Sequence, residues 1–233
     1  MKKYKHLFFD LDQTLWDFET NSTEVLNELF VKYKLSELGI NSCPEFIIKY
    51  KELNKLLWLQ YGKGQITKEK LRYGRFRGAF KIFKIKNNFL ADKLADEYLS
   101  LSPHKTNLLP HAENILSELK EYYVLHVITN GFREVQQIKL DKSGLNKFFT
   151  NIIVSDLLGH KKPDVKIFNH SLEKANAKPG EALMIGDNYE CDIEGARAAG
   201  IDQVYFNPNG SSAGPATYEI KCLSELRALL LKS

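Results

Sequence analysis

Short apolar runs that alternate with helical patterns constrain the fold of this chain more than any other feature. The five runs are Leu7–Phe9, Val124–Ile128, Ile152–Val154, Leu183–Ile185 and Val204–Phe206. Strands that alternate with helices predict βαβ units and a mainly parallel sheet, which is an α/β fold. The helices expected between and after the runs are Ala112–Tyr122, Glu134–Lys142, Val165–Asn176, Glu190–Ala199 and Ser224–Leu231. Pro163 is expected in the first turn of a helix and Gly200 at a helix end.

The alternation stops between about residue 16 and about residue 103, where apolar residues recur with helical spacing. Val25, Leu26, Leu29 and Phe30 are one example of this spacing. A structureless loop of that length would be unusual inside a compact domain. The sequence therefore predicts a helical insert, residues 16–103, in a core made of residues 1–15 and 104–233. The segment Asn209–Pro215, rich in Gly, Ser and Pro, is expected to be a surface loop.

The composition is ordinary for a soluble globular protein, with 43% hydrophobic and 27% charged residues. The first apolar run ends at Asp10, which makes it too short for a signal peptide, and no apolar stretch approaches the ~20 residues of a membrane span. Cys43, Cys191 and Cys222 lack zinc-site spacing and are interpreted as free thiols. We therefore expect a cytoplasmic protein with no membrane partner.

The net charge of +4 is too small to indicate nucleic-acid binding, so a nucleic-acid polymer is not the expected partner. The basic residues are unevenly distributed, however. Between Gly62 and Lys86 there are nine Lys or Arg residues and a single acid, Glu69. This segment is interpreted either as a solvated helix face or as a surface that faces an anionic substrate.

Polar residues follow the apolar runs at positions where a parallel sheet would bring them together. They are Asp10 and Asp12, then Thr129, Asn130 and Gly131, then Lys162, and finally Asp187 and Asp192. Ligands of open α/β sheets bind outside the carboxyl ends of the strands. We therefore expect these side chains to lie on one rim.

The acidic members of this group suit phosphoryl transfer. Asp10 can form a covalent aspartyl phosphate. Asp12 would point the same way from an extended strand, ~6.6 Å further along, and can handle the proton of the leaving oxygen. Magnesium prefers hard oxygen ligands, which Asp10 and Asp187 would supply, with Asp192 nearby or in the second shell.

The remaining members suit the binding of phosphate. The hydroxyl of Thr129 and the amides beside it, at Asn130 and Gly131, can hold phosphate oxygens. Lys162 can neutralise negative charge shared by the nucleophile and the phosphate. The adjacent Lys161 is expected to be solvated.

These motifs, in this order, resemble the haloacid dehalogenase-like hydrolase superfamily over nearly the whole chain. They are Asp10-x-Asp12-x-Thr14, Thr129, Lys162-Pro163 and Gly186-Asp187-x-x-x-x-Asp192. The resemblance implies a Rossmann-like, doubly wound core with an α-helical cap inserted after the first motif. It also implies that the backbone carbonyl of Asp12 joins the magnesium shell. The dehalogenases lack an acid at the position of Asp12, so its presence favours the phosphatase branch.

The insert is similar to the cap of the house-cleaning pyrimidine 5'-nucleotidases. The matching segments are Asn54–Tyr61, Gly64–Thr67, Gly74–Phe76 and Asn130–Phe132. Trp58 or Tyr61 could stack on a base, or both could belong to the core of the cap. We therefore expect a magnesium-dependent phosphatase of small phosphomonoesters, acting on a nucleoside 5'-monophosphate. The alternatives are a broad phosphatase of sugar phosphates or phosphoglycolate, and a non-enzymatic module that binds phosphate compounds.

Two further residues have expected roles outside the chemistry. His126 lies inside the second apolar run and is expected to be a packed core histidine. Cys191 lies beside the site, where a bystander role is favoured over an oxidisable thiol. The oligomeric state is left open by the sequence.

Overall fold

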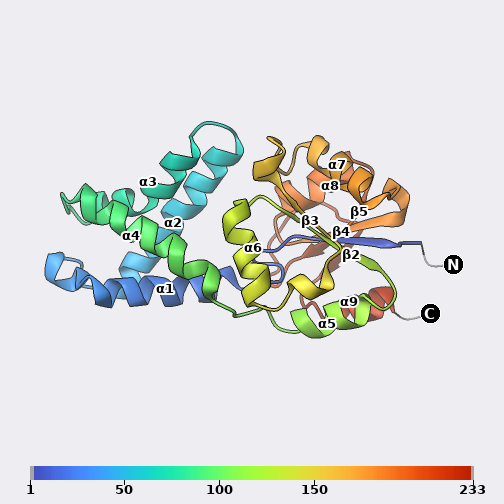
Figure 1. Ribbon diagram of the computed structural model, residues 1–233, viewed down its shortest axis with the longest axis horizontal. Helices are drawn as coiled ribbons and strands as arrows, with labels where there is room; N and C mark the ends of the chain where they lie inside the picture. Colours follow the sequence, from blue (N-terminus) through green and yellow to red (C-terminus); the bar gives the residue numbers. More distant parts are fainter. Residues whose placement is uncertain (1–2, 232–233) are drawn as a thin grey trace. The chain divides into compact units, whose positions relative to one another are not determined.

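Six strands form one parallel sheet in the computed structural model of the chain, which describes residues 3–231 (Figure 1). They are β1 (His6–Phe9), β2 (Val124–Thr129), β3 (Asn151–Val154), β4 (Ala182–Gly186), β5 (Asp202–Phe206) and β6 (Tyr218–Ile220). Their order across the sheet is β3-β2-β1-β4-β5-β6, and each neighbouring pair is parallel. The chain builds outward on one side of β1 and then on the other, which puts the topological switch point at β1. The predicted α/β, Rossmann-like core with a mainly parallel sheet is confirmed.

Helices cover both faces of the sheet because successive strand residues point to opposite sides. The helices are α5 (Ala112–Leu119), α6 (Arg133–Lys142), α7 (Val165–Ala175), α8 (Gly195–Ala198) and α9 (Glu225–Leu230). Leu7 and Phe9 of β1 belong to the apolar core that contains α5 and α9. Phe8, between them, belongs to the core that contains α7 and α8. The core is therefore doubly wound, as expected.

Three local features differ from the expectations. Strand β6 was not predicted, because it has only three residues and follows the exposed loop 209–215. Pro163 is not in the first turn of a helix: α7 begins at Val165, and Asp164 caps it by accepting the Lys166 N–H at 2.9 Å. The helix expected at 190–199 starts as a π-helical turn, Tyr189–Glu194, before it continues as α8.

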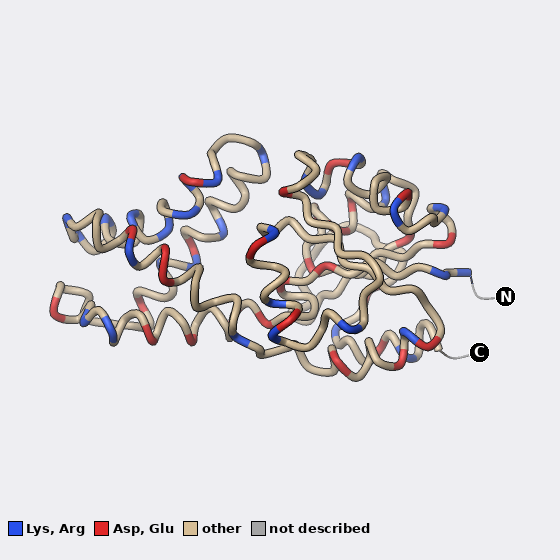
Figure 2. The backbone as a smooth tube through the Cα atoms, viewed as in Figure 1, with Lys and Arg blue, Asp and Glu red and all other residues tan. Residues whose placement is uncertain are grey.

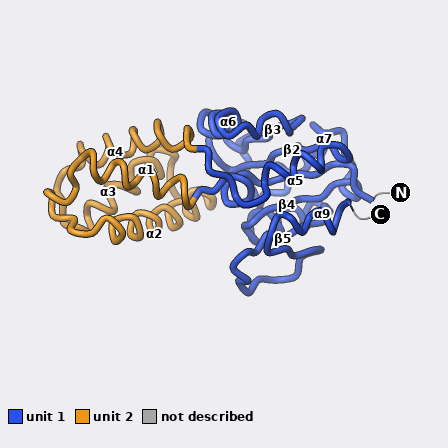
Figure 3. Tube along the Cα trace, turned by 90° about the horizontal axis from the view of Figure 1, so that it is seen from below, with its two compact units in different colours: residues 1–18, 106–233 blue, residues 19–105 orange. Residues whose placement is uncertain are grey.

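The chain divides into two compact units (Figure 3). Unit 1 comprises residues up to 18 and from 106 onward, and unit 2 comprises residues 19–105. The sequence placed these boundaries at 15 and 103. Unit 2 is helical and is built from α1 (Phe18–Lys32), α2 (Cys43–Gly62), α3 (Lys68–Ile82) and α4 (Asn88–Leu101).

Unit 2 has a hydrophobic core of its own, centred on aromatic side chains of its helices. Phe46, Tyr50, Phe76 and Tyr98 are all buried in it. Side-chain caps define where three of the helices begin, since Ser42, Thr67 and Asn87 accept a backbone N–H in the first turns of α2, α3 and α4. The unit is thus a separately packed helical insert rather than a loop.

The two ends of the insert are held together by unit 1. The Asp17 N–H donates to the carbonyl of Asn107 at 3.1 Å, and the Leu109 N–H donates to the carbonyl of Leu15 at 2.9 Å. Trp16, which lies between Leu15 and Asp17 in the sequence, is buried and forms a β-bridge with Leu108. The chain therefore leaves and re-enters unit 1 along adjacent paths.

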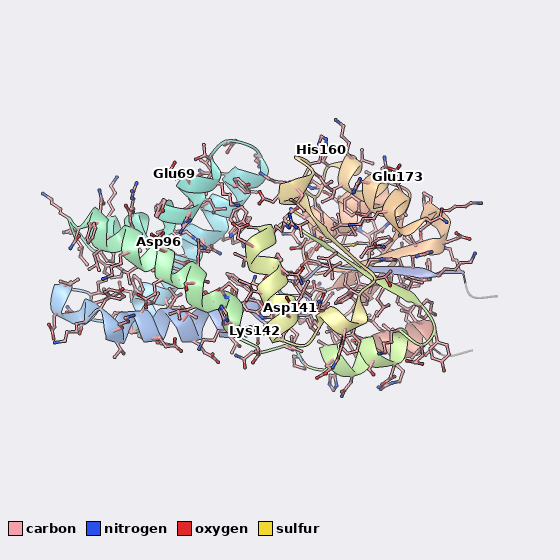
Figure 4. All side chains as sticks on the ribbon, viewed as in Figure 1. Glu69, Asp96, Asp141, Lys142, His160 and Glu173 are labelled. Carbon is pink, nitrogen blue, oxygen red and sulfur yellow. The ribbon has the colours of Figure 1, made fainter. Side chains whose placement is uncertain are left out.

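The basic segment 62–86 lies in and around α3, where Figure 2 shows Lys and Arg residues interspersed with acids of α4. Arg77 pairs with Asp92 at 2.6 Å, and Arg72 pairs with Asp96 at 2.8 Å. Asp96 is labelled in Figure 4. Part of the basic excess is therefore neutralised within unit 2, which favours the solvated-face interpretation for these arginines.

Two further sequence expectations concern covalent and membrane features. Cys43, Cys191 and Cys222 are free thiols. Among the helices of residues 3–231, none combines the length and apolar character that crossing a membrane requires.

Candidate active site

Asp10 lies directly after β1, at the switch point, and is 8% exposed. Its N–H donates to the carbonyl of Ile185 at 2.9 Å, which ties the residue to the adjacent strand β4. Its Oδ1 accepts a hydrogen bond from Lys162 Nζ at 2.5 Å. Burial raises the pKa of the Asp10 carboxyl, and the ammonium of Lys162 opposes this shift. The structure thus brings together the expected nucleophile and the expected lysine.

Lys162 is 3% exposed, and its ammonium is surrounded by acceptors. Nζ lies 2.5 Å from Asp10 Oδ1, 2.6 Å from Asp192 Oδ1 and 2.8 Å from the carbonyl of Ile128. Burial by itself lowers the pKa of Lys162, but the two carboxylates outweigh it and raise the pKa above its ordinary value. Lys162 is therefore a permanent positive charge that balances two buried acids.

Asn130 anchors the backbone of Lys162 through two hydrogen bonds. Its Nδ2 donates to the Lys162 carbonyl, and its Oδ1 accepts the Lys162 N–H, both at 2.9 Å. The sequence suggested that Asn130 and Gly131 bind phosphate. In the structure the Asn130 side chain is committed to Lys162, and the Gly131 N–H donates to Thr129 Oγ1 at 3.1 Å.

Two acids, Asp187 and Asp192, converge beside Asp10 near the ends of β1 and β4. Asp10, Asp187 and Asp192 each offer one carboxylate oxygen, and these oxygens lie within 4.8 Å of one another. Thr14 joins them: its hydroxyl lies 3.1 Å from Asp187 Oδ1 and accepts the Asp187 N–H at 3.1 Å. Burial raises the pKa of Asp187 well above its ordinary value, and Asp10 and Asp192 add to the shift. Three carboxyl groups therefore lie close together, and Lys162 pairs with two of them, Asp10 and Asp192.

Asp192 approaches the end of β4 so closely that it requires a glycine there. A Cβ at Gly186 would lie 2.3 Å from Asp192 Oδ2, well inside contact distance. The same Oδ2 accepts the Asn188 N–H at 3.0 Å. Asp192 lies in the first turn of the π-helical segment Tyr189–Glu194 and is 1% exposed.

Asp12 is held by two residues of α6 that the sequence did not single out. Lys139 Nζ lies 2.5 Å from Asp12 Oδ1, and Gln136 Nε2 donates to Asp12 Oδ2 at 2.8 Å. The Gln136 amide also donates to Thr129 Oγ1 at 2.6 Å. Lys139 and Gln136 are buried, whereas 30% of the Asp12 side chain is exposed. The expected proton-transfer acid and the expected phosphate-binding hydroxyl are therefore linked through one amide.

The remaining expected residues are placed as follows. Burial, with a contribution from Asp192, raises the pKa of the Cys191 thiol to about 12, which disfavours a reactive thiolate and supports the bystander interpretation. In unit 2, Tyr61 is buried at 8% exposure and Trp58 is half-buried, with ring centroids 5.8 Å apart. His126 is fully buried, as a core histidine should be.

Known proteins resemble this chain along its whole length. The haloacid dehalogenase-like hydrolase family matches residues 7–206. Pyrimidine 5'-nucleotidase YjjG of Escherichia coli is 32% identical over 99% of both chains. Pyrimidine 5'-nucleotidase PynA of Streptococcus pneumoniae is 32% identical over 99% of this chain and 96% of that one. A magnesium-bound crystal structure of the HAD-hydrolase YfnB of Bacillus subtilis has a TM-score of 0.88 at 30% identity, covering 98% of this chain and 99% of that chain.

Proposed function

The chain belongs to the haloacid dehalogenase-like hydrolase family and hydrolyses phosphoric monoester bonds, and on this premise we propose that it is a magnesium-dependent pyrimidine 5'-nucleotidase. The observation that carries the chemistry is the buried pair of Asp10 and Lys162 beside Asp187, with the partly exposed Asp12 two residues from the nucleophile. Two relatives that align over nearly their whole length are pyrimidine 5'-nucleotidases, which supports a nucleotide substrate. The binding-only alternative is not retained.

The proposed reaction has two steps. An oxygen of Asp10 attacks phosphorus, the bond from phosphorus to the leaving alcohol breaks, and Asp12 donates a proton to the alcohol oxygen. Asp12, now a carboxylate, then takes a proton from water. The water oxygen attacks the aspartyl phosphate, which releases inorganic phosphate and regenerates the Asp10 carboxylate.

Lys162 and Thr129 would stabilise the negative charge that develops during these steps. The ammonium of Lys162 lies at the distance of a direct hydrogen bond from Asp10, 2.5 Å, and opposes the burial that raises the pKa of the Asp10 carboxyl. Thr129 Oγ1 accepts hydrogen bonds from Gly131 and Gln136, so its own hydrogen is free for a phosphate oxygen. Fixed donors of this kind stabilise charge that develops in the transition state.

Asp10, Asp187 and Asp192 fit a magnesium ion. Their three oxygens within 4.8 Å form the hard donor set that magnesium prefers. Asp10 and Asp187 would hold the ion. The backbone carbonyl of Asp12 would be a further ligand, as the resemblance to the family implies. Asp192 would lie next to these ligands without binding the ion directly, since its Oδ1 is already paired with Lys162. When bound, the ion supplies positive charge that lets an anionic nucleophile meet an anionic phosphate.

Replacement of the nucleophile tests the chemistry. Asp10→Asn should abolish phosphate release from p-nitrophenyl phosphate in the presence of magnesium, because an amide cannot form the aspartyl phosphate. Asp141→Asn, an exposed acid at the end of α6 labelled in Figure 4, is the matched control and should keep full activity. Substantial turnover by Asp10→Asn would refute the mechanism.

A substrate panel tests the specificity. Pyrimidine nucleoside 5'-monophosphates should give a higher kcat/KM than purine nucleotides, sugar phosphates and phosphoglycolate. A clear preference for sugar phosphates or phosphoglycolate would reject the nucleotidase assignment while leaving the phosphatase chemistry intact.

A further inference from the structure

Both oxygens of the Asp12 carboxylate are engaged by a single helix of the core. Lys139 holds Oδ1 at 2.5 Å and Gln136 holds Oδ2 at 2.8 Å. The two residues are three apart on α6, so they lie on the same side of the helix. Asp12 therefore has a defined orientation before any substrate binds, although nearly a third of its side chain is exposed.

Lys139 has the features of a residue built for this contact. It is 4% exposed, and its ammonium lies 4.2 Å from the centroid of the Trp16 ring. In the part of the chain that the structure describes, Asp12 is the carboxylate with which it forms a salt bridge. Burying an ammonium costs free energy unless the charge is paired, and Asp12 supplies the negative partner of Lys139. By contrast Lys142, one turn later and labelled in Figure 4, is exposed.

Gln136 connects Asp12 to the phosphate-binding hydroxyl. The NH2 group of Gln136 faces Asp12, with Nε2 2.8 Å from Oδ2. The second hydrogen of that group goes to Thr129 Oγ1 at 2.6 Å. The amide oxygen, Oε1, is buried without a hydrogen-bond partner in the described structure. Gln136 therefore links the carboxylate of Asp12 to the hydroxyl of Thr129 through one NH2 group.

Gly131 leaves room for this amide. A Cβ at residue 131 would lie 2.4 Å from both Cδ and Nε2 of Gln136. A larger residue at this position would have to displace the Gln136 side chain from its place.

We propose that Lys139 and Gln136 are positioning residues that hold Asp12 for proton transfer, and that Gln136 also aligns the Thr129 hydroxyl toward the phosphate. This proposal rests on the function proposed above, in which Asp12 protonates the leaving alcohol. In this role Lys139 and Gln136 act by orienting Asp12 and Thr129, the residues that would contact the substrate.

The test compares two leaving groups. A nucleoside 5'-monophosphate releases an alkoxide that needs a proton, whereas p-nitrophenyl phosphate releases a stable phenolate. Because kcat/KM reports the steps up to departure of the leaving group, Lys139→Met and Gln136→Leu should lower it about 100-fold for the nucleotide. For p-nitrophenyl phosphate the loss should be less than about 10-fold. Lys142→Met and Gln137→Leu, exposed neighbours on α6, should match the wild type.

Two further variants separate positioning from folding. Lys139→Arg keeps the positive charge beside Asp12 and should recover most of the nucleotide activity. In an Asp12→Asn background, Lys139→Met should cause no additional loss, since the group that it positions is already gone. Equal losses for both substrates, or fully additive losses in the double variant, would overturn the proposal.

The Asp12→Asn variant separates a failure of the proposed function from a failure of the positioning role alone. If Asp12→Asn leaves the nucleotide activity intact, the proposed function fails. If Asp12→Asn lowers it selectively but Lys139→Met and Gln136→Leu do not, the chemistry stands and only the positioning role is refuted.

Discussion

Acidification should destabilise the fold through one buried histidine. His126 of β2 is fully buried, stacks on Phe8 with ring centroids 4.7 Å apart, and shares a 3.2 Å contact between its Nε2 and His6 Nδ1. Its Nδ1 lies 3.1 Å from Asn151 Nδ2. Burial lowers the pKa of His126 from 6.5 to about 4, and the neighbouring His6 adds to the shift. The folded protein therefore keeps this imidazole neutral at pH 5, where an unfolded chain would protonate it.

The size of the effect follows from proton linkage. Between pH 6.5 and about pH 4 the unfolded state binds more protons than the folded state, so the free energy of unfolding falls as the pH falls. Each pH unit in this window is worth about 1.4 kcal/mol. From pH 7 to pH 5, His126 should therefore remove about 2 kcal/mol of stability. Above pH 7 its contribution should be nearly constant.

Urea unfolding at pH 7 and pH 5 measures this change. Carboxylates also titrate as the pH falls, so wild type is compared with His126→Gln, which stays neutral and polar. The stability gap between the two proteins should shift by about 2 kcal/mol in favour of the variant at pH 5. His170→Gln, which replaces an exposed histidine of α7, is the control and should track the wild type. A gap for His126→Gln that is the same at both pH values would refute the reasoning.

Three other perturbations have defined outcomes. Removal of magnesium with a chelator should stop turnover and its return should restore it, as measured by phosphate release; turnover that persists in the chelator would exclude the metal role of Asp187. Gly131→Ala should displace the Gln136 amide, because of the 2.4 Å approach, and reproduce the selective loss on nucleotide kcat/KM expected for Gln136→Leu. Gly186→Ala should push Asp192 from its place and cost about 1–3 kcal/mol, seen as a Tm lower by roughly 2–12 °C; an unchanged Tm would show that the end of β4 tolerates a side chain.

The sequence predicted the site residues that lie at the carboxyl ends of strands. Asp10, Thr129 and Asp187 directly follow or end apolar runs, and parallel strands bring their carboxyl ends to one edge whatever the intervening length. This is why residues as distant as Asp10 and Lys162 could be expected together. The helical insert was visible for a similar reason, since its periodicity is long and consistent.

The parts that were missed depend on side chains that meet only in three dimensions. Gln136 and Lys139 lie on a polar helix next to Gln137 and Lys142, and nothing in the sequence distinguishes the buried pair from the exposed one. Only the packing of α6 shows which of them reach Asp12. The side chain of Asn130 likewise turned to the backbone of Lys162, a choice of rotamer that residue type does not reveal. Strand β6 is too short to have a periodicity.

The adjacent ends of the helical insert have a consequence for how the insert could be replaced. The hydrogen bonds between residues 17 and 107 and between 15 and 109 belong to unit 1, so this unit itself holds the two junctions side by side. An insert with a separate hydrophobic core can then be exchanged as a cassette without disturbing the nucleophile that precedes it. A chimera that joins this core to another helical insert at those junctions should keep Asp10, Lys162 and Asp187 in place, because all three belong to unit 1. The residues of the candidate active site and those of the insert's hydrophobic core therefore lie on separate stretches of the chain.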